Sequence, residues 1–111
     1  MNASAATTRS QSLGILLAVS SDSSSFTRAI RLAKEAQAKD INVFLYLLDD
    51  AVVAASQPDI QNLAETGVKI TACAYAAKRR SLHFADHITY GGLSILNDII
   101  MHSDRFISFC H

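Results

Sequence analysis

One cysteine, Cys73, stands where its sulfur could act as a nucleophile. It follows a short apolar run, residues 67–72, that predicts a buried β-strand, and the residues after it predict the first turns of a helix. Backbone N–H groups at the start of a helix and the nearby cations of residues 78–80 would both favour thiolate over thiol. Because the thiolate is the form that attacks other sulfur atoms, Cys73 is the predicted catalytic residue.

Three consecutive basic residues follow this cysteine: Lys78, Arg79 and Arg80. They could polarise the thiol, bind an acidic partner protein, or complement the dipole at the C-terminus of a helix. The sequence leaves these roles open, and we take all three residues as auxiliary candidates.

Other polar residues favour structural roles. Asp49 and Asp50 follow an apolar run, where they could line a site or cap a helix, and capping is the more common role. Residues 20–25 lack the glycines that would let backbone approach a phosphate, so they also predict a cap. His83 and His87 are four residues apart, but no third ligand accompanies them, and we expect no metal site.

Composition narrows the class of protein. The chain has 111 residues, half of them hydrophobic, and a formal net charge of zero, so one domain is expected and general binding to nucleic acid or an anionic membrane is not. The apolar runs are too short to cross a bilayer. Two cysteines are too few for a disulfide framework, which favours the reducing cytoplasm. Cys110 is expected to pack at the end of the last strand, with a role as resolving thiol as the alternative.

Strand-like and helix-like segments alternate along the chain. After a mobile tail, residues 1–12, one domain is expected over residues 13–111. Strands are expected at residues 13–19, 41–48, 68–72, 87–90 and 105–109, and helices at 26–36, 51–56, 59–66, directly after Cys73, and at 93–102. The alternation predicts an α/β fold of three layers, with a mostly parallel sheet of four or five strands. Residues 20–25, 49–50 and Cys73 should then share the edge where the strands end.

Residues 14–109 resemble the DsrE/TusD family of sulfur-relay proteins. The match is carried by residues 28–33, by residues 43–52, and most specifically by residues 73–80, a cysteine followed by small residues and the pair Arg79 and Arg80. Residues 88–93 and 103–109 are also similar to the end of that family's sequence. Two positions differ: Ala51 and Ser81 stand where the family often has glycine. An acidic helical segment of TusD-like proteins is also missing after Ser81.

The resemblance implies a function. In that family the matching cysteine, here Cys73, accepts sulfane sulfur as a persulfide and passes it to a partner, and Arg79 and Arg80 are its neighbours. It implies a DsrE/F-like fold and a sulfurtransferase without cofactor or metal. It also implies rhodanese-like or TusA-like donors, DsrC/TusE-like acceptors and a homotrimer or hexamer, with DsrF/DsrH-like subunits in some members. Sulfur relay for tRNA thiolation and for sulfur oxidation both fit this picture.

Two alternatives remain from the residues themselves. The chain could be a non-catalytic oligomer subunit or a redox-sensing scaffold, and a buried, unreactive Cys73 would favour that role. It could also be a small nucleotide-binding or flavin-binding domain, but it has neither a G-x-G-x-x-G sequence nor a P-loop.

Overall fold

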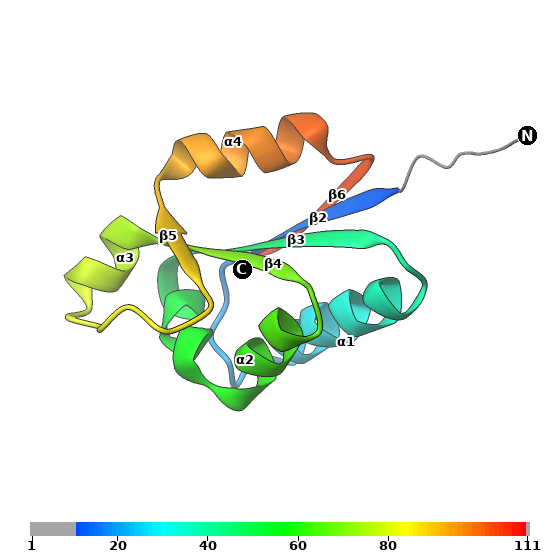
Figure 1. Cartoon of the computed structure of the whole chain (residues 1–111). Coiled ribbons are helices and arrows are strands. Elements are labelled where there is room, and N and C mark those ends of the chain that lie inside the picture. The colour runs from blue at the N-terminus through cyan, green and yellow to red at the C-terminus, as the bar shows by residue number, and fades with distance from the viewer. Residues whose placement is uncertain (1–10, 111) are drawn as a thin grey trace, which may run out of the picture.

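Five parallel strands form the centre of the protein. The computed structural model describes residues 11–110, and Figure 1 shows the helices arranged around the sheet. In chain order the strands are β2 (Ser12–Leu17), β3 (Asn42–Leu47), β4 (Lys69–Cys73), β5 (Thr89–Gly91) and β6 (Arg105–Phe109). Their order across the sheet is β5-β4-β3-β2-β6, and every neighbouring pair is parallel. The carboxyl ends of all five strands therefore lie along one edge, which we call the rim.

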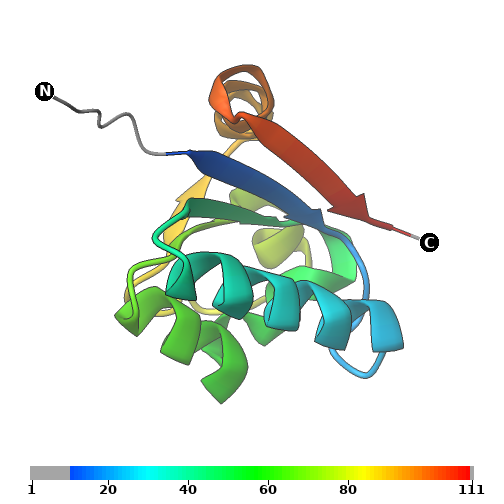
Figure 2. The ribbon, with the colours of Figure 1, turned by 90° about the vertical axis from the view of Figure 1, so that its right-hand side faces the viewer.

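The helices cover the two faces of the sheet unequally. α1 (Ser24–Ala38) and α2 (Pro58–Glu65) lie on one face together with the 3₁₀ helix η1 (Asp49–Ser56). α4 (Leu93–His102) lies on the other face, and the short α3 (Ala74–Arg79) extends from the end of β4 (Figures 1 and 2). The predicted three-layer α/β architecture is confirmed. The sheet has five strands, the upper number of those expected.

Side-chain alternation assigns each strand residue to one face. At Gly14 of β2, an added Cβ would lie 2.7 Å from a side-chain atom of Ile99 in α4, so Gly14 faces α4 and lets that helix approach closely. The register pairs Gly14 with Phe44, and Phe44 with Lys69. Every second residue faces the same way, so Tyr46, Thr71 and Cys73 also face α4. The opposite face carries the main core, which includes Ile15, Leu17, Leu45, Leu47 and Ile70.

Local signals for helix ends agree with the expectations. The side chain of Ser23 accepts a hydrogen bond from the N–H of Ser25 and caps α1, as predicted for the polar turn. Gly67 has φ +109° just beyond α2, a conformation that favours glycine at the end of a helix.

Some element boundaries and surfaces differ from the expectations. β4 includes Cys73, and β5 begins at Thr89 instead of residue 87. Residues 1–10 of the expected tail lie outside the described residues, whereas Ser12 already belongs to β2. The predicted packing of Cys110 is wrong, because it follows the edge strand β6 and is exposed. Within residues 11–110, no helix has the length and apolar character needed to cross a membrane.

Candidate functional site

Cys73 occupies the predicted junction between strand and helix. It is the last residue of β4 and the N-cap of α3, and its Sγ accepts a hydrogen bond from the backbone N–H of Ala76 at 3.4 Å. A backbone N–H directed at the sulfur stabilises negative charge on it. The sequence predicted this feature because an apolar run passes directly into a stretch of alanines there.

The Cys73 side chain is almost completely enclosed. It is 5% exposed, whereas Cys110 is exposed. Both thiols are free cysteines. The sequence could not give the accessibility of Cys73, because that depends on neighbouring strands that are distant in the chain.

Tyr46 is a polar residue of this site that the sequence analysis missed. It is fully buried, and its hydroxyl donates a long hydrogen bond of 3.4 Å to the carbonyl of Gly91. Burial raises the pKa of Tyr46 to about 12, and the charge of Cys73 and a hydrogen bond with it act in the same direction. The signal in the sequence was a lone tyrosine among the apolar residues 43–48, but only the pairing of strands brings it to Cys73.

A small hollow lies on the rim beside α3. Its volume is about 300 Å³, and it is lined by Asp49, Tyr75, Ala76, Arg79 and Arg80. Ala76 is the residue whose N–H reaches the Cys73 sulfur, whereas Cys73 itself does not line the hollow.

The three basic residues have different surroundings. Arg80 forms an ion pair with Asp50 at 3.0 Å and donates to the carbonyl of Ala76 at 3.2 Å, which ties the end of α3 to η1. The Arg79 guanidinium lies 5.8 Å from the centre of the exposed Tyr75 ring. Lys78 is exposed. All three lie at the far end of α3, about 9 Å along the axis from Cys73.

The remaining polar candidates lie in loops and at helix ends. Asp49 and Asp50 lie in the first turn of η1, but Leu48 occupies the capping position and no side chain caps it. His83 and His87 lie in the loop between α3 and β5 instead of on one helix. Within residues 11–110 no three His, Cys, Asp or Glu side chains gather as metal ligands. Residues 20–23 form the turn that ends in the α1 cap Ser23, and residues 24 and 25 already belong to α1.

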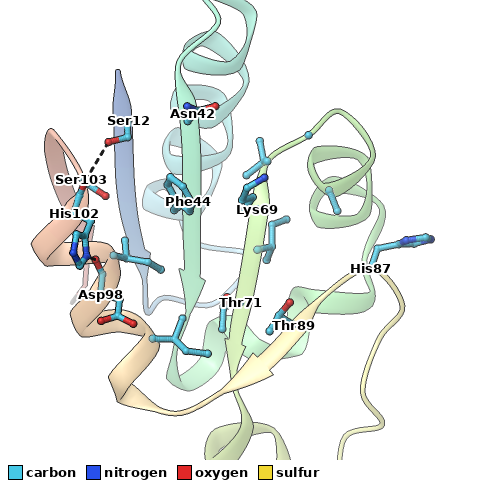
Figure 3. Close-up of a pocket in the computed structure, with 16 residues that line it drawn as sticks. Ser12, Asn42, Phe44, Lys69, Thr71, His87, Thr89, Asp98, His102 and Ser103 are labelled. Atoms are coloured by element: carbon cyan, nitrogen blue, oxygen red, sulfur yellow. Dashed lines mark hydrogen bonds between the residues drawn. The ribbon is translucent and has the colours of Figure 1, made fainter. Parts of the chain in front are cut away.

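A larger hollow lies on the α4 face of the sheet. Its volume is about 760 Å³, and Figure 3 shows Lys69, Thr71 and Thr89 on the strand side, with Asp98 and His102 on α4 opposite. His102 contacts the Asp98 carbonyl through Nδ1 at 2.9 Å, and the His87 side chain points away from the hollow. Cys73 does not line this hollow. Its lining mixes charges of both signs and shows no concentrated charge for a phosphate or a metal.

Known proteins similar to this chain agree on one fold. The model of the DsrE/DsrF-like family matches residues 11–109. The crystal structure of ychN protein from E. coli superposes with a TM-score of 0.78 at 22% identity, covering 89% of this chain and 99% of that one. A conserved protein of unknown function from Bacteroides thetaiotaomicron, BT1422, has a TM-score of 0.70 at 16% identity, over 89% and 95% of the two chains. No curated protein matches.

Proposed function

The chain belongs to the DsrE/DsrF-like family, which is associated with sulfur relay, and from this premise we propose that it is a sulfurtransferase that carries sulfane sulfur as a persulfide on Cys73. One observation supports the assignment to this residue most directly. The cysteine ends a central strand of the sheet, with a backbone N–H directed at its sulfur and a surface hollow reaching the same residue, Ala76. Strand ends of parallel sheets are where such folds place their chemistry.

The transfer step is a thiol–persulfide exchange. The Cys73 thiolate attacks the outer sulfur of a donor persulfide, a new S–S bond forms at Cys73, and the donor's own S–S bond breaks. The donor leaves as a thiolate that takes the electron pair of the broken bond, so no external oxidant or reductant is required. The persulfide on Cys73 then passes its outer sulfur to an acceptor thiolate by the same exchange in the opposite direction.

The three auxiliary residues have different roles in this proposal. Arg80 holds α3 against η1 through Asp50 and so steadies the helix that contributes the Ala76 N–H. Arg79 lines the hollow beside α3 and Lys78 precedes it in the chain, and both are exposed, so they would meet an acidic surface on a donor or acceptor protein. Rhodanese-like or TusA-like donors and DsrC/TusE-like acceptors are the proposed partners, and the cytoplasm is the proposed compartment.

We further propose that copies of this chain associate through the outer surface of α4. Leu93, Ile100 and Met101 are large apolar side chains of this helix that remain exposed, at 62%, 44% and 70%. Such side chains gathered on one helix favour burial against another apolar surface, and the chain carries no net charge to oppose self-association. Light scattering should show a trimer or hexamer, and Met101→Lys should shift it toward monomer, whereas an unchanged mass would contradict this interface.

Intact-mass spectrometry after incubation with inorganic polysulfide tests the carrier function. We expect the wild-type chain and Cys110→Ser to gain one sulfur atom and Cys73→Ser to gain none, because only Cys73 has the activating surroundings. Treatment with dithiothreitol should remove the added sulfur, since it is held in a reducible bond. A gain that persists in Cys73→Ser would contradict the proposal.

The non-catalytic alternative has one observation in its favour, the 5% exposure of Cys73. In that role the chain would be an oligomer subunit or a redox-sensing scaffold of the same fold. Wild-type protein that gains no sulfur, and whose Cys73 also resists alkylation in the folded state, would support this role instead.

A further inference from the structure

The Tyr46 side chain crosses the strand that ends in Cys73. Tyr46 lies on β3 and its hydroxyl reaches the Gly91 carbonyl on β5, while β4 lies between these two strands. The register pairs Gly91 with Cys73, and it pairs Tyr46 with Thr71, two residues before Cys73. Tyr46 and Cys73 therefore face the same side of the sheet, and the phenol spans from one flank of β4 to the other at the level of the cysteine.

Burial keeps this hydroxyl protonated. Tyr46 has no exposed surface, so solvent does not compete for hydrogen bonds with its hydroxyl. The pKa of Tyr46 lies well above neutral pH. A buried hydroxyl requires hydrogen-bond partners. Its hydrogen bond to the Gly91 carbonyl is long, at 3.4 Å, so a stronger acceptor beside the hydroxyl would receive the hydrogen bond instead.

We propose that Tyr46 is a positioning residue for Cys73, and that its hydroxyl donates a hydrogen bond to the sulfur when Cys73 is a thiolate. This inference rests on the proposed sulfur-carrier role. With a neutral thiol, the hydroxyl donates to the Gly91 carbonyl, and its oxygen can accept a hydrogen bond from the S–H group. When the thiol loses its proton to solvent, the hydroxyl turns its own proton to the sulfur and releases the Gly91 carbonyl. The sulfur then has two donors, Tyr46 and the Ala76 N–H, and no electron is transferred.

The test measures the rate at which iodoacetamide alkylates Cys73 as a function of pH. All variants carry Cys110→Ser as the background, so that Cys73 is the thiol whose alkylation is measured. Tyr46→Phe removes only the hydroxyl. We expect its alkylation rate at pH 7 to fall about tenfold and the midpoint of its pH profile to move to higher pH, because a hydrogen bond to the charged form is lost. The rate at high pH should be unchanged, since the thiolate forms there in both proteins.

Tyr90→Phe is the matched control. Tyr90 lies in β5, and its hydroxyl accepts a hydrogen bond from the Ala85 N–H in the preceding loop, so the same atom is removed without touching Cys73. Its profile should coincide with that of the background. A Tyr46→Phe profile identical to the background would overturn the inference, and so would a change in the high-pH rate alone, which would indicate altered access instead of altered charge stabilisation.

A second measurement covers the case in which Tyr46→Phe does not fold. Ultraviolet titration of phenolate in Cys73→Ala should show Tyr46 ionising at lower pH than in the wild type, because the negative sulfur beside it is gone. An unchanged titration would overturn the inference. Failure of the carrier function is separate: a wild type that gains no sulfur contradicts that function, even if the alkylation profile shifts as expected here.

Discussion

The two cysteines of this chain both lie at the end of a strand, yet their surroundings are opposite. Cys73 ends β4, which has a neighbour on each side, and its sulfur receives the N–H of the helix that follows. Cys110 follows β6, the strand at the edge of the sheet, and is exposed with no described helix after it. Position at a strand end alone therefore does not give a cysteine the surroundings of Cys73. Those surroundings come from a central strand, the helix that follows it and a buried backbone N–H donor.

Exposure of a thiol to solvent and stabilisation of its thiolate occur at different cysteines of this chain. Cys110 is the thiol that a reagent meets first, whereas Cys73 has the groups that stabilise negative sulfur. In the proposed carrier role, enclosure would keep the sulfur from solvent thiols, and a partner or a local opening of α3 would supply access.

The largest expected effect is a difference in labelling by a bulky reagent. A maleimide attached to polyethylene glycol should modify Cys110 about a hundredfold faster than Cys73 in the folded protein, because this bulky reagent reaches Cys73 only after local opening. The difference should vanish in denaturant, where both thiols are exposed. Gel shifts measure the labelling rate of Cys110 in Cys73→Ser and the labelling rate of Cys73 in Cys110→Ser. Equal rates in the folded protein would show that Cys73 is open and that the contrast is wrong.

A smaller effect is expected on stability at high pH. The pKa of Tyr46 is raised from 10.0 to about 12 in the folded protein, so the folded state holds its proton where the unfolded state has lost it. This contribution is fully present below pH 10 and is lost as the pH rises toward 12, at a total of about 2 to 3 kcal/mol. Urea unfolding at several pH values should show a steeper loss for the wild type than for Tyr46→Phe. Parallel curves would contradict the buried environment of the phenol.

The smallest effect concerns the end of α3. Ser81 has φ +55°, and the hydrogen bonds from Ser81 N–H to Lys78 and from Leu82 N–H to Ala77 form a Schellman cap, in which glycine is preferred. Ser81→Gly should raise the free energy of unfolding by about 0.5 to 1 kcal/mol and slow the labelling of Cys73, while Cys110 labelling stays constant.

Ser103→Gly is the control for the cap, since Ser103 has φ −83° at the end of α4 and gains nothing from glycine. It should leave stability unchanged or lower it. A stabilisation by Ser103→Gly equal to that of Ser81→Gly would mean that backbone strain at Ser81 is not the cause.

Much of the fold followed from the sequence. Uninterrupted apolar runs predicted the parallel strands, and residues 93–102 and 105–109 were assigned with the observed bounds, because their apolar spacing is clear and no glycine interrupts them. The strand order could not be predicted. The strand order depends on which apolar runs pair with one another. It places β6 at an edge and β4 inside the sheet, and Cys110 is therefore exposed whereas Cys73 is enclosed.

The site was predicted only in part for the same reason. The junction at Cys73 is local, so its helix and its N–H donor could be expected from neighbouring residues. Tyr46 lies 27 positions away in the chain, and only the pairing of β3 with β4 brings it to the cysteine. The ion pair of Arg80 with Asp50 joins two elements that follow different strands, so the sequence named both residues without showing that they meet.

Peptide mapping of the wild-type protein tests the central claim most directly. After incubation with inorganic polysulfide and capping with iodoacetamide, trypsin separates residues 70–78, which contain Cys73, from residues 106–111, which contain Cys110. We predict the additional sulfur atom on the first peptide, although Cys110 is the more exposed thiol. Additional sulfur on the second peptide alone would show that exposure decides the reaction and would contradict the assignment of Cys73 as the sulfur carrier.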